Sequence, residues 1–127
     1  MSDQTPAEAH QLVQDFFSAW VKRDPDLVAS FFTEDGVYHN IPQERTQGRE
    51  AIRDLVAIWM EALEGMEFRF QRVMVEGNSI AFERFDVVPG GSGPKELPCA
   101  GFMDIRDGKI ALWREYWDFN QMMEAAK

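Results

Sequence analysis

The hydrophobic pattern of the chain changes its period near Gly65, and this change limits the fold more than any other feature. Before Gly65, apolar residues recur three and four residues apart, which is typical of helices that bury one face. After it, apolar and polar residues alternate, as they do in half-buried strands. Helices that come first and strands that come last indicate an α+β fold, with a curved sheet wrapped around a helical layer.

Three helices are expected before the change of period. Thr5-Pro6-Ala7-Glu8 combines a capping threonine, a proline at the first helical position and a glutamate three residues after the cap. A second, short helix begins at Asp24-Pro25. The third follows Gly48 and ends at Gly65. Its apolar stripe has near-ideal helical spacing and consists of Ile52, Leu55, Val56, Trp59, Met60 and Leu63.

The second half of the chain predicts a mostly antiparallel sheet. Gly77-Asn78 and Asp107-Gly108 have the composition of tight hairpin turns. Residues 89–94 are expected to form a flexible loop, and a polar loop is expected to precede Gly48. The expected strands span residues 37–42, 68–76, 79–88, 97–106 and 109–119. With 127 residues and no sign of a linker, the chain is expected to form a single domain over residues 1–127.

Composition excludes several classes of function. The net charge of −9 disfavours nucleic acid and membranes as partners, because phosphate groups require clustered Lys and Arg side chains. The single cysteine, Cys99, excludes an internal disulfide and fits a reducing compartment. No secretory signal is visible, and no apolar stretch approaches the roughly 20 residues of a membrane helix. We therefore expect a cytoplasmic protein.

Arg84 and Asp86 are the first candidates for a reaction site. On a strand they share one face with Ile80, Phe82 and Val88, so the pattern predicts an ion pair that faces an apolar space. Such a pair needs further polar partners and is common at reaction sites. An Arg–Asp pair on a strand is also common as a simple salt bridge.

The last strand offers a second carboxylate on each of its faces. Glu115 lies on one face and Asp118 on the other, and alternation alone does not choose between them. Two carboxylates bridged by an arginine have a clear chemical use: one polarises water while the other, protonated, donates to a leaving oxygen. Tyr38 and Asn40, which share a strand face, are placed to orient the same water.

Other chemistries have weaker support. Cys99 and His39 could form a nucleophile pair, but no motif surrounds them. Two histidines are too few for a convincing zinc site, and no glycine-rich phosphate loop follows a strand. We therefore expect neither a metal nor a cofactor.

Five short segments carry a resemblance to a known family. They are Tyr-His-Asn-Ile-Pro (38–42), Gly-Arg-Glu-Ala-Ile (48–52), Glu-Arg-Phe-Asp-Val (83–87), Gly-Phe-Met-Asp-Ile (101–105) and Asp-Gly-Lys-Ile-Ala-Leu-Trp-Arg-Glu-Tyr-Trp-Asp (107–118). With them the chain resembles the limonene-1,2-epoxide hydrolase family, within the nuclear transport factor 2-like and polyketide cyclase-like superfamily. The resemblance implies a cone-shaped fold with a deep pocket. It also implies a homodimer that hydrolyses a small hydrophobic epoxide in one step.

The resemblance also implies a role for each candidate residue. Asp86 is expected to protonate the epoxide oxygen, and Arg84 to bridge two carboxylates. The second carboxylate falls on Glu115, where the family has an aspartate that is about 1.5 Å shorter. Tyr38 and Asn40 are expected to hold the attacking water. By position, the apolar substrate-binding wall falls on Trp59, Met60, Leu63, Val88, Leu97, Cys99 and Trp117.

Three alternatives stay open: two kinds of enzyme and one non-catalytic module. A ketosteroid isomerase-like enzyme would have a base aspartate near Asn40 and a tyrosine on the first helix, where this chain has Phe16 and Phe17. A polyketide cyclase-like enzyme would share the pocket and use an acidic residue. A non-catalytic, dimeric binding module would need only the pocket and an apolar outer sheet face. The outward positions that fit such a dimer are Ala81, Phe85, Val87, Leu112 and Tyr116.

Overall fold

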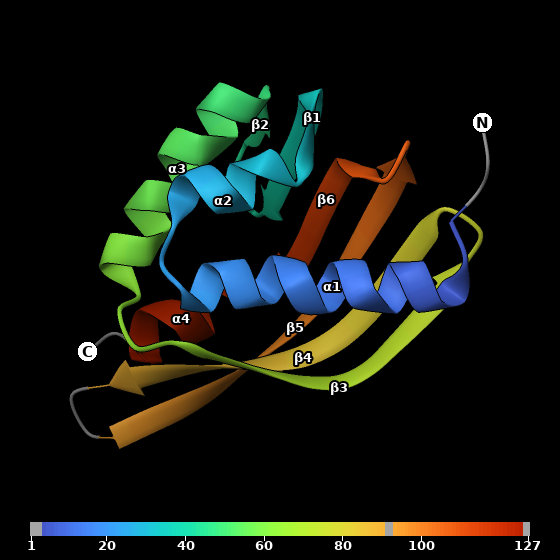
Figure 1. Cartoon of the computed structure of the whole chain (residues 1–127). Coiled ribbons are helices and arrows are strands. Elements are labelled where there is room, and N and C mark those ends of the chain that lie inside the picture. Colours follow the sequence, from blue (N-terminus) through green and yellow to red (C-terminus); the bar gives the residue numbers. More distant parts are fainter. Residues whose placement is uncertain (1–3, 91–92, 126–127) are drawn as a thin grey trace.

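The computed structural model of the protein describes residues 4–90 and 93–125. Over these residues the chain forms one mixed sheet and several covering helices (Figure 1). The elements in chain order are α1 (Pro6–Val21), α2 (Pro25–Ser30), β1 (Phe32–Ile41), β2 (Arg45–Gln47), α3 (Arg49–Ala62), β3 (Glu67–Glu76), β4 (Ser79–Gly90), β5 (Gly93–Arg106), β6 (Lys109–Trp117) and α4 (Phe119–Ala125). The α+β fold expected from the change of period is confirmed.

The sheet has six strands in the order β2-β1-β6-β5-β4-β3. Only β1 and β6 pair in parallel; the other described neighbours are antiparallel. The sheet is curved and unclosed. The helix α1 lies across it, and α2 and α3 lie together near β1 (Figure 1). The curved sheet with helices over one face agrees with the cone-shaped fold that the resemblance implied.

The start of α1 follows the predicted cap. Thr5 Oγ1 accepts a hydrogen bond from Glu8 N at 3.1 Å, and Glu8 Oε1 accepts one from Thr5 N at 2.9 Å. The apolar stripe of α1 then packs onto the sheet, where Phe16, Phe17 and Trp20 are buried. Edge-to-face ring contacts join Phe16 and Phe17 to Trp113 of β6. The helix is therefore fixed in position directly over the strands that carry the charged candidates.

Two elements were not expected from the sequence. The strand β2 is three polar residues that pair with the edge of β1, and such a short segment has no readable alternation. The helix α4 begins where a strand was expected to continue. Asp118 Oδ1 accepts hydrogen bonds from Asn120 N at 2.9 Å and Gln121 N at 3.2 Å, so this side chain caps α4.

The loop expected at residues 89–94 is wrong at both ends, because β4 runs to Gly90 and β5 begins at Gly93. Its centre, residues 91–92, lies outside the described residues. No described helix is long and apolar enough to cross a membrane.

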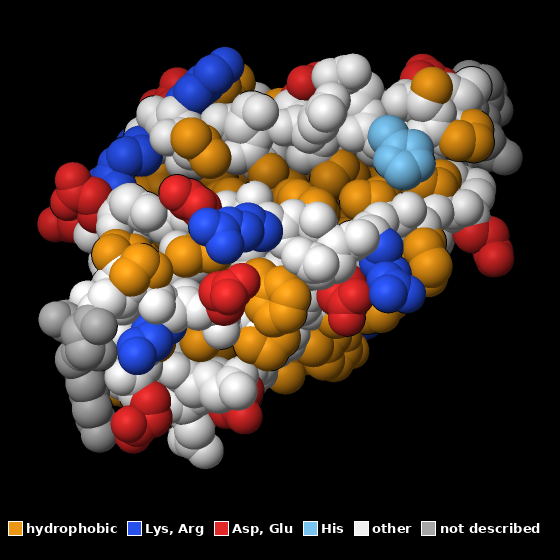
Figure 2. Space-filling view, turned by 90° about the horizontal axis from the view of Figure 1, so that it is seen from below, with side chains coloured by type: hydrophobic (Ala, Val, Ile, Leu, Met, Phe, Trp, Pro, Cys, Tyr) orange, Lys and Arg blue, Asp and Glu red, His pale blue; other side chains and the backbone are white. Residues whose placement is uncertain are grey.

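The core lies between α1, α3 and the inner face of the sheet. It is less closed along the edge strand β3, where hydrophobic side chains form a band at the surface (Figure 2). The residues of β3 that pack against the core are only partly buried: Phe68, Phe70, Val73 and Val75. A smaller apolar cluster lies under α4 and contains Val88, Leu97 and Ala125. The end of the cone near α4 is therefore closed by this cluster.

Candidate active site

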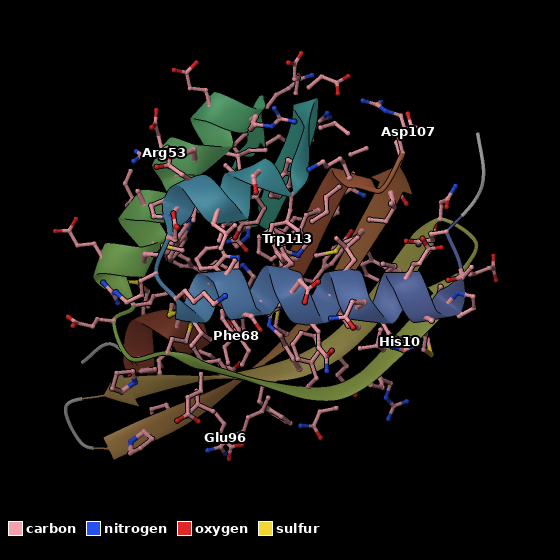
Figure 3. All side chains as sticks on the ribbon, in the orientation of Figure 1. His10, Arg53, Phe68, Glu96, Asp107 and Trp113 are labelled. Carbon is pink, nitrogen blue, oxygen red and sulfur yellow. The ribbon has the colours of Figure 1, made fainter. Side chains whose placement is uncertain are left out.

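Three adjacent strands bring the charged candidates to one face of the sheet. Arg84 on β4 pairs with Cys99 on β5, which pairs with Trp117 on β6. Two residues farther along β5, Gly101 pairs with Glu115 of β6. Because side chains alternate between faces, all of these positions face α1. Figure 3 shows Trp113, another residue of this face, in the space between α1 and the sheet.

Arg84 joins the two carboxylates directly. Its Nε donates to Asp86 Oδ1 at 2.6 Å and its Nη2 donates to Asp86 Oδ2 at 3.1 Å. Its Nη1 donates to Glu115 Oε2 at 2.6 Å, and its Nη2 also donates to Glu115 Oε1. Arg84 is 2% exposed and Glu115 is 3% exposed. The cluster is therefore a buried carboxylate–guanidinium–carboxylate bridge with each carboxylate held at both oxygens.

Glu115 reaches Arg84 across the intervening strand because Gly101 has no side chain. A Cβ atom at Gly101 would lie closer to Glu115 Oε2 and to the ring of Phe82 than real Cβ atoms approach other groups. Trp113 Nε1 donates a further hydrogen bond to Glu115 Oε2 at 2.9 Å. The longer glutamate is thus accommodated and held by three donors from two side chains.

Tyr38 and Asn40 enter the site from β1. This strand pairs in parallel with β6, with Tyr38 opposite Trp113 and Asn40 opposite Glu115. The Tyr38 and Trp113 rings stack with centroids 4.3 Å apart and planes 8° apart. Trp117 Nε1 donates to Asn40 Oδ1 at 2.5 Å, which orients the amide. The NH₂ group of Asn40 can then donate toward a bound molecule.

These side chains surround one cavity of about 40 Å³. All five residues predicted as catalytic line it: Tyr38, Asn40, Arg84, Asp86 and Glu115. Four residues of the predicted substrate-binding wall also line it: Trp59, Leu63, Cys99 and Trp117. The chain thus brings together in space residues that were predicted from five separate segments.

The other three predicted wall residues lie elsewhere. Met60 lines an adjoining hollow between the ends of α1 and α3. Val88 and Leu97 pack with Ala125 beneath α4. These two positions lie farther along β4 and β5, where α4 covers the inner face of the sheet, so they are outside the lining of the cavity.

The cavity wall also contains residues that the sequence reasoning did not single out. They are Trp20, Met66, Phe68, Trp113 and Met122. Alternation already put Trp113 on the face of Glu115, so its hydrogen bond to that carboxylate could have been anticipated. Met122 belongs to α4, which was not expected, and its role in the wall had no sequence signal.

Burial determines the protonation states in the site. Loss of solvent raises the pKa of Glu115 above its ordinary value, and this effect outweighs the opposing effect of Arg84. For Arg84, burial would lower the pKa, but the charges of Glu115 and Asp86 raise it well above its ordinary value. Two carboxylates and one guanidinium leave one excess negative charge. Burial disfavours such an uncompensated charge.

Tyr38 and Cys99 are neutral for the same reason. Burial is the main cause that raises the pKa of the Tyr38 phenol well above its ordinary value, so its hydroxyl remains a donor. Burial likewise raises the pKa of the Cys99 thiol far above the physiological range. Since the thiolate is the reactive form, this cysteine is a poor nucleophile.

His39 alternates with Tyr38 and Asn40, and its side chain therefore leaves β1 on the opposite face.

The surroundings of two further positions show whether they belong to the reaction site. Asp118 is exposed and caps α4, so it is not the second carboxylate of the site. On the first helix, where an isomerase would carry a tyrosine, Phe17 packs its ring 4.9 Å from the guanidinium carbon of Arg84. Among the described residues, no group of three or more His, Cys, Asp and Glu side chains is arranged to hold a metal ion.

Comparison with known proteins identifies the family of the chain. The model of the SnoaL-like domain matches residues 13–113. The epoxide hydrolase EphG of Mycobacterium tuberculosis (strain ATCC 25618 / H37Rv) is 30% identical over 112 residues, which cover 88% of this chain and 74% of that protein.

Solved structures lead to the same group. An LEH-like epoxide hydrolase from M. tuberculosis matches with a TM-score of 0.76 and 27% identity, covering 94% of this chain and 89% of the other. A putative SnoaL-like polyketide cyclase from Jannaschia sp. CCS1 matches with a TM-score of 0.82 and 16% identity, covering 98% and 96%, and shows the shared fold. The protein therefore belongs to the SnoaL-like domain family and is similar to epoxide hydrolases of M. tuberculosis.

Proposed function

We propose that the protein hydrolyses a hydrophobic epoxide to a vicinal diol by a single attack of water. The observation that carries this proposal is the buried bridge in which Arg84 holds Asp86 and Glu115 together at the wall of an apolar cavity. Opening an epoxide needs a base for the water and an acid for the oxygen of the ring. In this proposal Glu115 is the base and Asp86 is the acid.

In the proposed reaction, Glu115 removes a proton from a water molecule oriented by Tyr38 and Asn40. The water oxygen forms a bond to one epoxide carbon while the bond from that carbon to the ring oxygen breaks. Asp86 delivers its proton to that oxygen, and the diol forms without a covalent bond to the protein. The proton on Glu115 then returns to Asp86 through exchange with solvent, which restores the starting state.

The glutamate at position 115 is compatible with this chemistry. Its carboxylate is fixed by Arg84 and by Trp113, and Gly101 provides the space that the additional methylene group requires. A carboxylate held at this precision keeps a defined distance to the water, which matters because displacement by about 1 Å can lower a rate roughly 100-fold. These contacts support Glu115 as the base at the position of the family's aspartate.

Diol formation from a panel of cyclic, terpenoid and aryl epoxides tests the proposal. We expect wild-type turnover, and we expect Asp86→Asn to lower kcat at least 100-fold while the protein still binds the epoxide, because the amide cannot give up a proton. Glu83→Gln is the matched control, since Glu83 is an exposed carboxylate on the opposite face of β4. Binding without turnover by the wild type across the panel would instead indicate a binding module.

A further inference from the structure

Trp117 holds the side chain of Asn40 in one orientation. Trp117 Nε1 donates to Asn40 Oδ1 at 2.5 Å. An indole nitrogen is a donor only, so it pairs with the oxygen of the amide and not with its NH₂ group. Turning the amide over would lose this hydrogen bond and set two donors against each other. The indole therefore determines which end of the amide faces away from it.

The ring of Trp117 is itself fixed by two helices. It packs edge-on against Trp59 of α3, with ring centroids 6.2 Å apart. It also lies tilted against Phe119 at the start of α4, with ring centroids 5.9 Å apart. The strand β6 carries Trp117 on the same face as Glu115, because the two positions are two residues apart. The indole donor is thus held in place beside the site.

The orientation set by Trp117 leaves the NH₂ group of Asn40 in contact with the cavity. Asn40 lines the cavity, and within the described part of the chain its Nδ2 donates to no protein atom. Nδ2 is also not among the fully enclosed, unpartnered side-chain atoms, so it keeps contact with the cavity space. Over residues 4–90 and 93–125 those enclosed atoms are Trp20 Nε1, His39 Nδ1 and Trp59 Nε1.

The direction of this hydrogen bond matters because Glu115 is the neighbour of Asn40. The two residues pair directly across β1 and β6, and both line the cavity. An amide oxygen that faced a water molecule here would accept one of its protons and compete with the Glu115 carboxylate for it. The NH₂ group donates to the oxygen of the water instead. A proton of the water is then left to point at Glu115.

From this arrangement we infer, on the basis of the proposed function, that Trp117 is a positioning residue for the attacking water. It acts through Asn40. By occupying Oδ1, the indole keeps the NH₂ group toward the water and so directs a water proton to Glu115. This role is separate from that of the Trp117 ring as an apolar part of the cavity wall.

Trp117→Phe tests this inference, since it keeps an aromatic ring in the wall and removes the N–H donor. For an epoxide of the reactive panel, kcat should fall about five- to tenfold and KM should change less than about twofold, as for the loss of one orienting hydrogen bond. In the Asn40→Ala background the same substitution should change kcat less than about twofold, because no amide is left to orient. Equal losses of kcat in both backgrounds would overturn the inference, and so would a change in KM alone.

Trp20→Phe is the matched control. Trp20 also lines the cavity, but its N–H has no acceptor within the described part of the chain. Whatever effect Trp20→Phe has on kcat should be the same in the wild type and in Asn40→Ala, since Trp20 does not act through the amide. If its effect disappeared in Asn40→Ala as that of Trp117→Phe does, the specific link between Trp117 and Asn40 would be overturned.

NMR of the indole N–H protons separates this inference from the proposed function. The Trp117 signal, assigned by its absence in Trp117→Phe, should move upfield in Asn40→Ala because its acceptor is lost. If no epoxide is turned over but this signal moves, Trp117 still orients Asn40 toward a bound molecule while the hydrolase proposal fails. A signal that stays in place in Asn40→Ala overturns the inference whether or not the protein hydrolyses epoxides.

Discussion

Gly101 determines whether Glu115 can reach Arg84, although it has no side chain of its own. It lies on β5, directly between the strand of the guanidinium and the strand of the carboxylate. The bridge therefore depends on an empty volume as well as on three charged groups. Sequence reasoning identified the charged residues, but nothing in the sequence showed that this glycine separates them.

Gly101→Ala should lower kcat about 100-fold, because the new methyl group must push the Glu115 carboxylate away from Arg84. Steady-state kinetics with thermal unfolding of the same samples measures the effect in folded protein. The methyl group also meets the ring of Phe82, so the double variant Gly101→Ala/Phe82→Leu separates the two contacts. Recovery of activity in the double variant would contradict the role given to Glu115.

The raised pKa of Glu115 predicts a shifted pH profile. As the base, Glu115 must be ionised, and burial raises its pKa above the 4.5 of an ordinary glutamate. The value of kcat/KM should therefore fall as the pH decreases through a point above 4.5. A value of kcat/KM that stays constant down to pH 4.5 would exclude Glu115 as the base.

At the scale of elements, the strength of the local signal decided what could be predicted. The helices α1 and α3 have long apolar stripes, and α1 begins at a capping box. The two hairpins have residues typical of tight turns. In contrast, β2 is too short to show a period. The end of β6 runs straight into α4, with Asp118 as the only marker of the change. Met122 belongs to α4, so the part of the cavity wall that α4 provides was missed with it.

Asp118→Ala should loosen α4, because it removes the acceptor for two backbone N–H groups at the start of this helix. Loss of such a cap costs about 1 kcal/mol. Hydrogen exchange should become faster at residues 119–125 and stay unchanged in β4. KM should rise more than kcat falls, since Met122 lines the cavity without contributing chemistry. Asn120→Ala, at an exposed position of α4, is the control; unchanged exchange in Asp118→Ala would contradict the capping role.

At the scale of the whole molecule, the outer face of the sheet is the surface that the sequence predicted as a dimer interface. Tyr116 and Phe102 lie there as an edge-to-face pair with ring centroids 5.9 Å apart, and they are 44% and 46% exposed. The inner face is covered by α1 and the core, whereas the outer face is open to a second copy.

We propose that the protein is a homodimer through this face, with a mass in solution about twice the 14.7 kDa of the chain. Phe102→Glu/Tyr116→Glu should yield monomers, because four like charges would meet across the interface of the two copies. Ile58→Glu, an exposed apolar position on α3, should leave the dimer intact. Sedimentation analysis distinguishes these results, and a monomeric wild type at tens of micromolar would contradict the proposal.

The origin of the diol oxygen tests the central claim most directly. A single turnover, with enzyme in excess over an epoxide of the reactive panel, is carried out in ¹⁸O-labelled water. If Glu115 activates a water molecule that attacks the ring, the diol from the first turnover contains one ¹⁸O atom and the protein contains none. An unlabelled first-turnover diol, with ¹⁸O found later in the Glu115 or Asp86 carboxyl group, would mean that a protein carboxylate attacks the epoxide and would contradict the account.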